Sequence, residues 1–346
     1  MYAQPASFRL TPSKPTRPSW RDKILLIMTY LEMSRDAGHG GGTWGFTNCL
    51  WAPTKKKGGG NWPFWNKVSS VREGDIVLHL RGITPNAHFV GYSVASCDGF
   101  ETSRRPPNPG EWSYAESFYR ADLAGFTPFH QSVNLSNIFA SRNLELNTYF
   151  DANRLRKSNK AHIFFVRQSG RLQCLNGAYL SDVDEGLLTA LFGDGKELAV
   201  PGTRHSIISI ETGSQISTIR SRLGQARFAS LIKKLYGNAC CFPGCVVSDP
   251  RFLVASHIAR WSDNEHLRGN MGNGLCLCLV HDRAFEIGLF TLDQFHRVFV
   301  NPRERQSASA IVKELLVHQG ECIRVSEIKP LDDALLEHWI RVDVEP

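Results

Sequence analysis

The part of the sequence richest in reactive side chains runs from Leu253 to Asp293 and reads LVASHIARWSDNEHLRGNMGNGLCLCLVHDRAFEIGLFTLD. It holds histidines, an asparagine and carboxylates within the length of one small supersecondary unit, which is more polar chemistry than turns and helix caps require. Imidazole titrates near neutral pH and can take a proton from water, and carboxylates bind hard divalent cations. The stretch therefore predicts a metal-dependent active site.

The same stretch has a simple expected order of elements. Leu253–Ile258 is a short apolar run suited to a buried strand, Asn270–Gly274 is rich in turn residues, and Leu275–Val280 is a second apolar run. His281–Glu286 contains neither proline nor glycine, and Gly288 stands where a short helix would end. The pattern predicts a hairpin of two strands followed by a helix.

This unit places His257 on the first strand, Asn273 in the connecting loop and His281 at the start of the helix. The order His, Asn, His, with the segments ASHI, NGL and HDRAFEIGLFT around it, resembles the HNH nuclease family over roughly Tyr236–Val300. The resemblance implies a ββα-metal fold and the hydrolysis of a DNA phosphodiester with one Mg²⁺ or Mn²⁺ ion. An isolated His-Asn-His order would imply nothing.

Each residue then receives an expected role. His257 is the candidate general base that removes a proton from the attacking water. Asn273 is expected to fix the loop and, through it, the orientation of that imidazole. His281 is the first candidate ligand of the catalytic cation, which stabilises the charge that develops on the phosphate.

The rest of the metal shell stays open at this point. Asp282 and Glu286 are four residues apart and share one face of a helix, so either carboxylate is able to complete the shell. Many members of the family carry an acidic residue or a second histidine just before the base. Ser256 occupies that position here, and a hydroxyl is a weak ligand.

The cysteines suggest a second kind of metal site. The chain has 9 cysteines, an odd number with irregular spacing, which favours reduced thiols or a metal site over a secreted disulfide framework. Some HNH proteins hold their hairpin with a structural Zn²⁺, and the resemblance implies Cys241 and Cys245 as one half of such a site, with Cys276 or Cys278 in the other. The alternative is a set of buried free thiols.

Aromatic residues and lysines alternate in the first half of the chain. The segment TWGFTNCLWAPTKKKGGGNWPFWN begins at Thr43 and surrounds a Lys-Gly loop with aromatic rings. Rings stack on bases while ammonium groups contact phosphates, so the segment suits a nucleic-acid ligand. The alternative is a tryptophan-rich core beside a solvated loop.

The segment from Val71 to Ser96 alternates apolar and polar residues in two expected strands. Its Gly74-Asp75 strand start, with a tryptophan shortly before it, and its Val90-Gly91-Tyr92 strand are similar to the EVE domain, a small β-barrel of the PUA-like superfamily. The resemblance extends over roughly Trp20–Leu191. It implies recognition of a modified base that is flipped out of the DNA stack. The expected base-binding residues are Trp44, Trp62, Trp65 and Tyr92.

The chain is expected to be an α+β protein of two domains. We expect a disordered arm at 1–19, an EVE-like barrel with flanking helices at 20–192, a linker at 193–205, and the HNH domain at 206–346 with its ββα-metal core at about 236–300. Helical spacing over Ser214–Tyr236 leaves basic residues on its remaining faces. They are either solvated or in contact with the DNA backbone: Arg220, Arg222, Arg227, Lys233 and Lys234.

Composition limits the function further. The formal charge is +7 over 346 residues, which fits a partner with phosphates, and no apolar run approaches the length of a membrane span. A cytoplasmic bacterial protein is expected. The leading hypothesis is a restriction endonuclease that reads 5-methyl- or 5-hydroxymethylcytosine in duplex DNA, and cutting both strands favours a homodimer. The alternatives are an HNH nuclease that reads unmodified DNA and a DNA-binding protein with an inactive nuclease domain.

Overall fold

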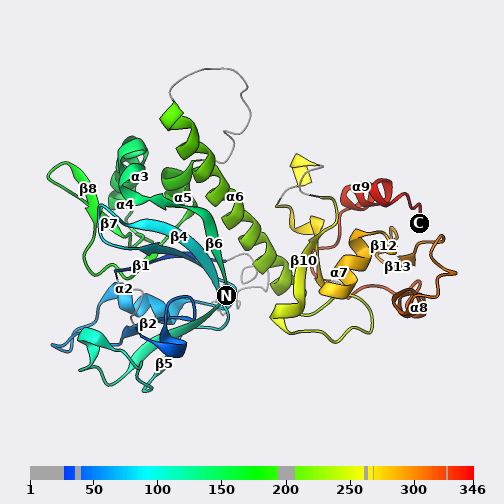
Figure 1. Cartoon of the computed structure of the whole chain (residues 1–346), viewed down its shortest axis with the longest axis horizontal. Helices are drawn as coiled ribbons and strands as arrows, with labels where there is room; N and C mark the ends of the chain where they lie inside the picture. Colours follow the sequence, from blue (N-terminus) through cyan, green and yellow to red (C-terminus); the bar gives the residue numbers. More distant parts are fainter. Residues whose placement is uncertain (1–26, 36–39, 194–206, 261–263, 268, 325) are drawn as a thin grey trace, which may run out of the picture.

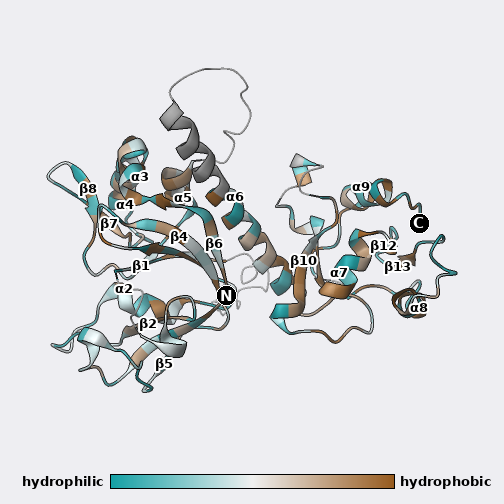
Figure 2. Ribbon diagram, in the orientation of Figure 1, coloured by the Kyte–Doolittle hydropathy of each residue, from teal (hydrophilic) through white to brown (hydrophobic). Residues whose placement is uncertain are grey.

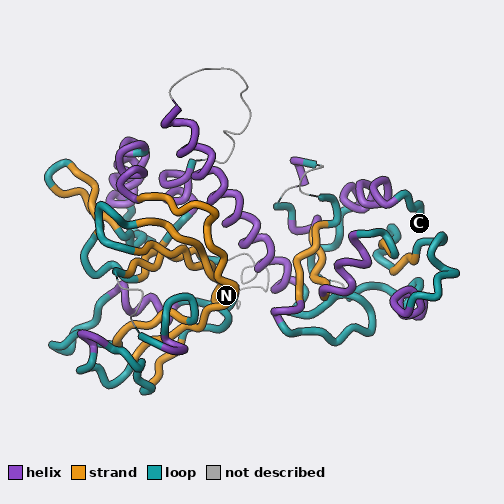
Figure 3. Tube along the Cα trace, viewed as in Figure 1, coloured by secondary structure: helices purple, strands orange, loops and turns teal. Residues whose placement is uncertain are grey.

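The computed structural model describes residues 27–35, 40–193, 207–260, 264–267, 269–324 and 326–346. The predicted arm at 1–19 and nearly all of the predicted linker at 193–205 lie outside these residues. Two lobes of mixed helix and strand stand on either side of one long helix (Figures 1 and 3). The α+β class expected from the sequence is confirmed.

The N-terminal lobe is built on a seven-stranded sheet with the order β2-β6-β4-β3-β1-β9, and β5 pairs with β6 off this path. All described neighbours are antiparallel except β1 and β3, which run parallel. The strands are β1 (Thr29–Ser34), β2 (Cys49–Pro53), β3 (Ile76–Arg81), β4 (His88–Ala95), β5 (Phe100–Thr102), β6 (Phe118–Asn134) and β9 (Leu180–Asp182).

This sheet curls into a half-barrel. The long strand β6 pairs with β2, β4 and β5, and its register against β4 shifts near Gly91. A Cβ on Gly91 would lie 2.5 Å from the carbonyl oxygen of Thr127, so only glycine allows the strands to approach there. The two ends of the sheet come close together, because the backbone N–H of Trp51 on β2 donates to the hydroxyl of Tyr179 just before β9 (3.1 Å).

Helices and a small hairpin complete the N-terminal lobe. Side-chain caps begin two of the helices: Asn134 accepts a bond from the N–H of Asn137, and Asp184 accepts one from that of Leu187. The remaining elements are α2 (Pro63–Asn66), α3 (Leu135–Ser141), α4 (Asn143–Leu155), β7 (Phe165–Gln168), β8 (Arg171–Cys174) and α5 (Glu185–Phe192), with short 3₁₀ turns at Gly42–Trp44, Lys67–Ser70 and Gly110–Trp112.

The long helix α6 (Ile207–Leu235) belongs to both lobes. Ile219 and Leu223 are buried in the large N-terminal core, whereas Phe228 and Ile232 are buried in the core of the C-terminal lobe. The sequence predicts this helix over 214–236 as part of the second domain. Its described side chains instead belong to two hydrophobic cores, because apolar residues continue along the helix beyond those that pack in the N-terminal core.

The C-terminal lobe contains the predicted hairpin and helix. β10 (Leu253–His257) pairs antiparallel with β11 (Gly274–Cys278), and α7 (Leu279–Glu286) follows without a break. The lobe is completed by β12 (Phe290–Leu292), β13 (Val298–Val300), α8 (Ala310–Val317), α9 (Asp332–Val342) and 3₁₀ turns at Pro250–Phe252, Glu265–Leu267 and Met271–Asn273. Figure 2 shows hydrophobic stretches on β10 and on the helices of this lobe, alternating with hydrophilic ones. None of the helices in the described residues is long and apolar enough to cross a membrane.

Candidate active site and metal centre

His257 is the last residue of β10, and its ring is partly buried. The phenyl ring of Phe228, from α6, lies stacked on the imidazole with 4.2 Å between ring centroids and 11° between the planes. Burial lowers the pKa of His257 below its ordinary value, so the ring is neutral at neutral pH. A neutral imidazole is the form that accepts a proton from water.

Asn273 fixes the chain that leaves His257. Its side chain is buried, with Oδ1 accepting from the N–H of Ala259 (2.7 Å) and Nδ2 donating to the carbonyl oxygens of Ala259 (3.0 Å) and Leu267 (3.2 Å). The backbone carbonyl of Asn273 also accepts from the N–H of Ile258 (3.0 Å). One amide therefore holds both ends of the loop between the strands, which is the position that the sequence assigns to it.

A cysteine–histidine cluster lies at the other end of the hairpin. One ligand atom from each of Cys240, Cys245, Cys278 and His281 can be chosen so that all four lie within 4.8 Å of one another. His281 Nδ1 is 3.5 Å from the sulfur of Cys240 and 3.2 Å from that of Cys278. In a tetrahedral Zn²⁺ site the ligand atoms are about 3.5–3.8 Å apart, since Zn–S is about 2.3 Å and Zn–N about 2.0 Å. The donors and their spacing fit Zn²⁺.

Local structure explains why these four side chains meet. A tight turn brings Cys240 and Cys245 together, and Gly244 within it has a φ of +69°, which favours glycine. Cys278 is the N-cap residue of α7, and His281 lies one turn later on the same side of the helix. The ring of Phe242 stacks on His281 at 3.9 Å and covers one face of its imidazole.

The cluster differs from the predicted zinc set at two positions. Cys245 and Cys278 belong to it, but Cys240 takes the place of Cys241, and Cys276 lies outside it. Adjacent residues in extended chain point in opposite directions, so only one of Cys240 and Cys241 can face the cluster, and the sequence does not say which. The N–H of Cys241 instead bonds to the carbonyl of Cys276 (2.7 Å), and both side chains are buried in the core.

His281, the first candidate for the catalytic metal, is directed into this cysteine cluster. Its Nε2 lies 3.7 Å from a carboxylate oxygen of Glu314, and burial lowers its pKa. In the hairpin, Cys278 pairs with Leu253 whereas His257 pairs with Gly274, four positions further on. At about 3.4 Å per residue these pairs are about 14 Å apart. The structure does not bring His281 Nδ1 to His257.

Glu286, the last residue of α7, lies nearer the His257 end of the hairpin. Glu286 accepts a bond from Arg260 Nε (2.9 Å), and Arg260 follows His257 by three residues, so α7 ends beside the C-terminal end of β10. A guanidinium nitrogen of Arg341 is 3.3 Å from the other oxygen of Glu286. Asp282 is partly exposed one helical turn earlier on the same face. Ser256, in contrast, is buried in the hairpin and does not face solvent.

The four aromatic residues expected to bind a base lie in different places. Trp44 is buried in a small cluster with Trp51 and Phe118, and Trp65 packs against a second core. Trp62 and Tyr92 pack at the edge of the largest core, and both remain partly exposed. The four rings are therefore spread over three clusters.

Of these four rings, Trp62 has the most polar surroundings. Its indole N–H donates to the carbonyl of Gly177 (2.7 Å), and the ammonium of Lys56 lies 4.1 Å from the ring centroid. This pairing of a partly exposed indole with a lysine from the Lys-Gly loop is the combination that the sequence associates with stacking and phosphate contact.

Sequence reasoning missed a buried polar network in the half-barrel. His79 on β3 is within hydrogen-bond distance of Glu32 Oε2 through Nδ1 and of Ser93 Oγ through Nε2, both at 2.9 Å. Arg81 lies 3.1 Å from Glu32 and 3.8 Å from the centroid of the Phe46 ring. The available signal is a charged or titratable residue inside an otherwise apolar strand, as in TYLEMS and IVLHLR.

The basic residues of α6 contact the protein itself. Arg220 and Arg227 form ion pairs with Glu185 of α5, and Arg222 donates to the carbonyl of Pro128 (3.3 Å). Burial lowers the pKa of Lys233, and the side chain of Lys234 packs against Gly74. These contacts join α6 to its neighbours.

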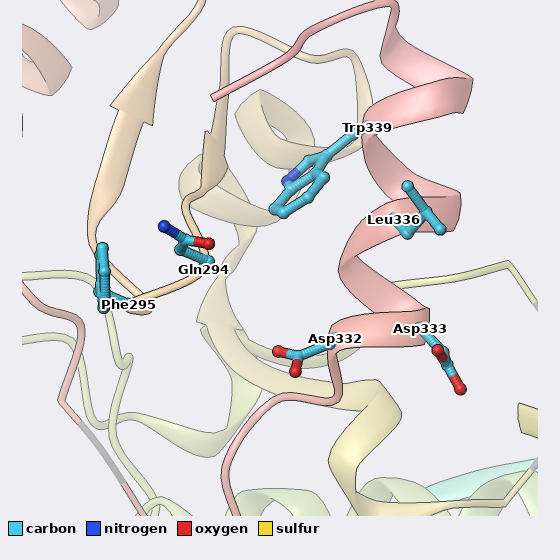
Figure 4. A pocket seen from close by; sticks show the side chains of 6 residues that line it. All are labelled: Gln294, Phe295, Asp332, Asp333, Leu336 and Trp339. Carbon is cyan, nitrogen blue, oxygen red and sulfur yellow. The ribbon is translucent and has the colours of Figure 1, made fainter.

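A hollow of about 450 Å³ lies beside α9 (Figure 4). Phe295 and Leu336 give it exposed apolar surface, and Asp332 and Asp333 give it negative charge. None of the site residues discussed above lines this hollow. The negative charge does not suit a DNA backbone.

Comparisons with known proteins agree with the C-terminal geometry. Residues 240–293 match the family model described as HNH endonuclease. The match includes His257, Asn273 and all four cluster residues. The C-terminal lobe therefore carries an HNH endonuclease domain. A search of curated proteins finds no match.

Solved structures resemble about half of the chain at low identity. They include a hypothetical protein from Leishmania major (10% identity, 47% of this chain, 90% of that chain, TM-score 0.29). Human THYN1, solved with DNA containing 5-methylcytosine, gives 6% identity, 46% and 93% coverage, and a TM-score of 0.28. The N-terminal domain of McrB from Staphylothermus marinus gives 13% identity, 47% and 92% coverage, and a TM-score of 0.26.

Proposed function

We propose that this protein is a modification-dependent restriction endonuclease. Its N-terminal lobe recognises 5-methyl- or 5-hydroxymethylcytosine in duplex DNA, and its HNH domain hydrolyses a phosphodiester bond nearby. The nuclease part of this proposal is supported by His257, a neutral imidazole that is held in place. Asn273 lies beside it, and both residues fall within the segment that matches the HNH family. The reading half rests on the sequence resemblance to the EVE domain.

In this proposal His257 removes the proton from the attacking water. Asn273 holds the chain on both sides of the loop, so that the imidazole keeps one orientation while DNA binds. Asp282 and Glu286 hold the Mg²⁺ or Mn²⁺ ion, since hard oxygen donors suit these cations. The ion supplies charge stabilisation at the phosphate and the leaving oxygen.

Arg260 and Arg341 place positive charge around Glu286 at the same end of α7. Their contacts fix the direction of that carboxylate. Asp282, which is partly exposed, is therefore the first ligand of the cation, and Glu286 becomes a second ligand if the two arginines turn toward the DNA phosphates.

We assign Zn²⁺ to Cys240, Cys245, Cys278 and His281 as a structural ion. Burial raises the pKa values of the Cys240 and Cys245 thiols, and Zn²⁺ binding displaces those protons. The ion joins the turn that contains Cys240 to the junction of β11 and α7. It thereby fixes the start of the helix that carries Asp282.

For base recognition we retain Trp62 and Tyr92, which are partly exposed, ahead of Trp44, which is buried. A flipped base requires unstacking, which costs a few kcal/mol and must be offset by ring contacts. A methyl group adds only about 0.8 kcal/mol of apolar burial, so the fit of the pocket must supply most of the discrimination.

The alternative functions are a nuclease that reads unmodified DNA and a DNA-binding protein without nuclease activity. The arginine contacts of Glu286 favour the second, because they compete with a cation for the carboxylate. A cleavage assay with Mg²⁺ or Mn²⁺ on matched duplexes that carry cytosine, 5-methylcytosine or 5-hydroxymethylcytosine separates the three functions. We expect cutting of a modified duplex only. Equal cutting of all three would exclude modification dependence, and binding without cutting would favour the inactive nuclease.

A further inference from the structure

One uninterrupted helix anchors the two lobes to each other. α6 extends from Ile207 to Leu235, and its described side chains enter both hydrophobic cores. Figure 1 shows the helix passing from the N-terminal sheet to the hairpin of β10 and β11. The linker that the sequence predicts at 193–205 would precede this helix in the chain. It would therefore not lie between the two parts of the helix that are anchored in the two lobes.

The middle of the helix, at residues 219–227, is fixed to the N-terminal lobe by apolar and ionic contacts. Ile219 and Leu223 are 2% and 4% exposed within the large core. Arg220 and Arg227, which are about two helical turns apart, both pair with Glu185 of α5. An anchor of this kind resists both sliding and rotation of α6, because the ionic contacts lie on a different face from the buried leucine and isoleucine.

The C-terminal end of the helix, from Phe228 onward, is fixed to the nuclease hairpin. Phe228 and Ile232 are buried against Gly274, where a Cβ would collide with both side chains. Phe228 also stacks on His257. The helix therefore packs directly on the strands that carry the general base.

The distance between the two anchors is short. Leu223 and Phe228 are five residues apart, which is about 7.5 Å along a helix. Just beyond the helix, Asn238 Nδ2 donates to Glu73 Oε1 in the turn before β3 (3.2 Å), and Lys234 packs on Gly74 in the same turn. These contacts add a second connection beside the helix, so the lobes are held at two places.

We propose that α6 sets the distance between the base that is read and the bond that is cut, so the protein cleaves at one fixed spacing from the modified cytosine. This inference rests on the proposed function. A lobe on a flexible linker would sample many phosphates, whereas a lobe on an anchored helix reaches the same one each time. The specificity-determining residues are then Ile219, Leu223, Phe228 and Ile232, although none of them needs to contact DNA.

The test maps cut positions at nucleotide resolution on a duplex with one modified cytosine. For the wild type we expect one dominant position on each strand. Eight Gly/Ser residues inserted after Gly224 have a root-mean-square length of about 15 Å, which is between four and five base pairs, so this variant should spread its cuts over that range. The substitution Gly224→Ala is the matched control, because a Cβ there meets nothing within 4 Å and the cut position should stay single.

A second measurement needs no DNA and no activity. Spin labels at Leu144 on α4 and Val317 on α8, which are 77% and 73% exposed, report the distance between the lobes. We expect one narrow distance distribution for the wild type and a broad one for the Gly/Ser insertion.

The outcomes separate this inference from the function on which it rests. Scattered cuts around a modified base, or a broad wild-type distance distribution, would overturn the fixed spacing and leave the modification dependence standing. Cutting that ignores the modification, or no cutting at all, would overturn the proposed function. In that case the distance distribution still decides whether α6 fixes the lobes.

Discussion

The aromatic ring of Phe228 lies parallel to the imidazole of His257, with 4.2 Å between centroids and 11° between planes. Phe228 comes from α6 and His257 from the end of β10, so the contact joins the interlobe helix to the candidate base. The phenyl ring covers one face of the imidazole. The edge of the imidazole, which carries the two nitrogens, is therefore left for contacts with other groups.

The first prediction concerns the position of the His257 imidazole, which this stack holds. Phe228→Leu keeps an apolar side chain but removes the flat surface, so the imidazole gains freedom to tilt. We expect kcat to fall on the order of tenfold with little change in DNA affinity, because small misplacement of a reacting group is costly. Phe228→Tyr, which keeps the ring, should restore most of the rate. Equal losses in both variants would indicate a general packing defect.

A second prediction distinguishes between Asp282 and Glu286, the two carboxylates that the sequence leaves as alternative ligands of the cation. Asp282→Asn should raise the Mg²⁺ concentration for half-maximal cleavage at least about tenfold, since it removes a charged ligand without changing shape. Glu286→Gln should weaken its contacts with Arg260 and Arg341 and shift the Mg²⁺ requirement less. Titrations of cleavage rate against Mg²⁺ measure both. The reverse order of effects would make Glu286 the principal ligand.

The pH dependence of cleavage gives a third prediction. Burial lowers the pKa of His257, and a general base works only in its neutral form, so activity is present above the folded-state pKa and is lost as the pH falls through it. The acidic limb should therefore lie below about pH 6.5, the ordinary value for histidine, with about a tenfold loss per pH unit. Rates of single-turnover cleavage between pH 5 and pH 8 provide the measurement. A limb above pH 7 would exclude His257 in this environment.

A fourth prediction concerns the cysteines. Cys240→Ala and Cys278→Ala should lose bound Zn²⁺ and lower the unfolding temperature, because the ion contributes to folding of the lobe. Cys241→Ala and Cys276→Ala are matched controls, since both side chains are equally buried but lie outside the cluster. They should keep one Zn²⁺ per chain in elemental analysis. Loss of Zn²⁺ from the controls but not from the first pair would instead support a site that contains Cys241 and Cys276, the other choice that the sequence allows.

The hairpin and helix around His257 could be predicted because their signals are local. The turn residues at 270–274, the apolar runs beside them and Gly288 after the helix are all close in sequence. The zinc set was predicted only in part. Choosing Cys240 over Cys241 requires knowing which way each side chain points. The inclusion of His281 requires the helix to begin just after Cys278.

The arrangement of the N-terminal lobe could not be predicted to the same extent. Trp51 and Tyr179 meet although they are 128 residues apart, and Glu32 meets His79 across the parallel pair of β1 and β3. Such contacts depend on the order of strands in the sheet, which the apolar alternation of single strands does not specify. For this reason the sequence identified aromatic residues as candidates but did not place them in separate clusters.

Cleavage by His257→Ala tests the central claim most directly. The assay compares this variant with the wild type on a duplex containing 5-methylcytosine in the presence of Mg²⁺, with circular dichroism and DNA binding as controls for folding. We expect a folded variant that binds the duplex normally and cuts it at less than about a thousandth of the wild-type rate. Cleavage at the wild-type rate by this variant would contradict the assignment of His257 as the general base.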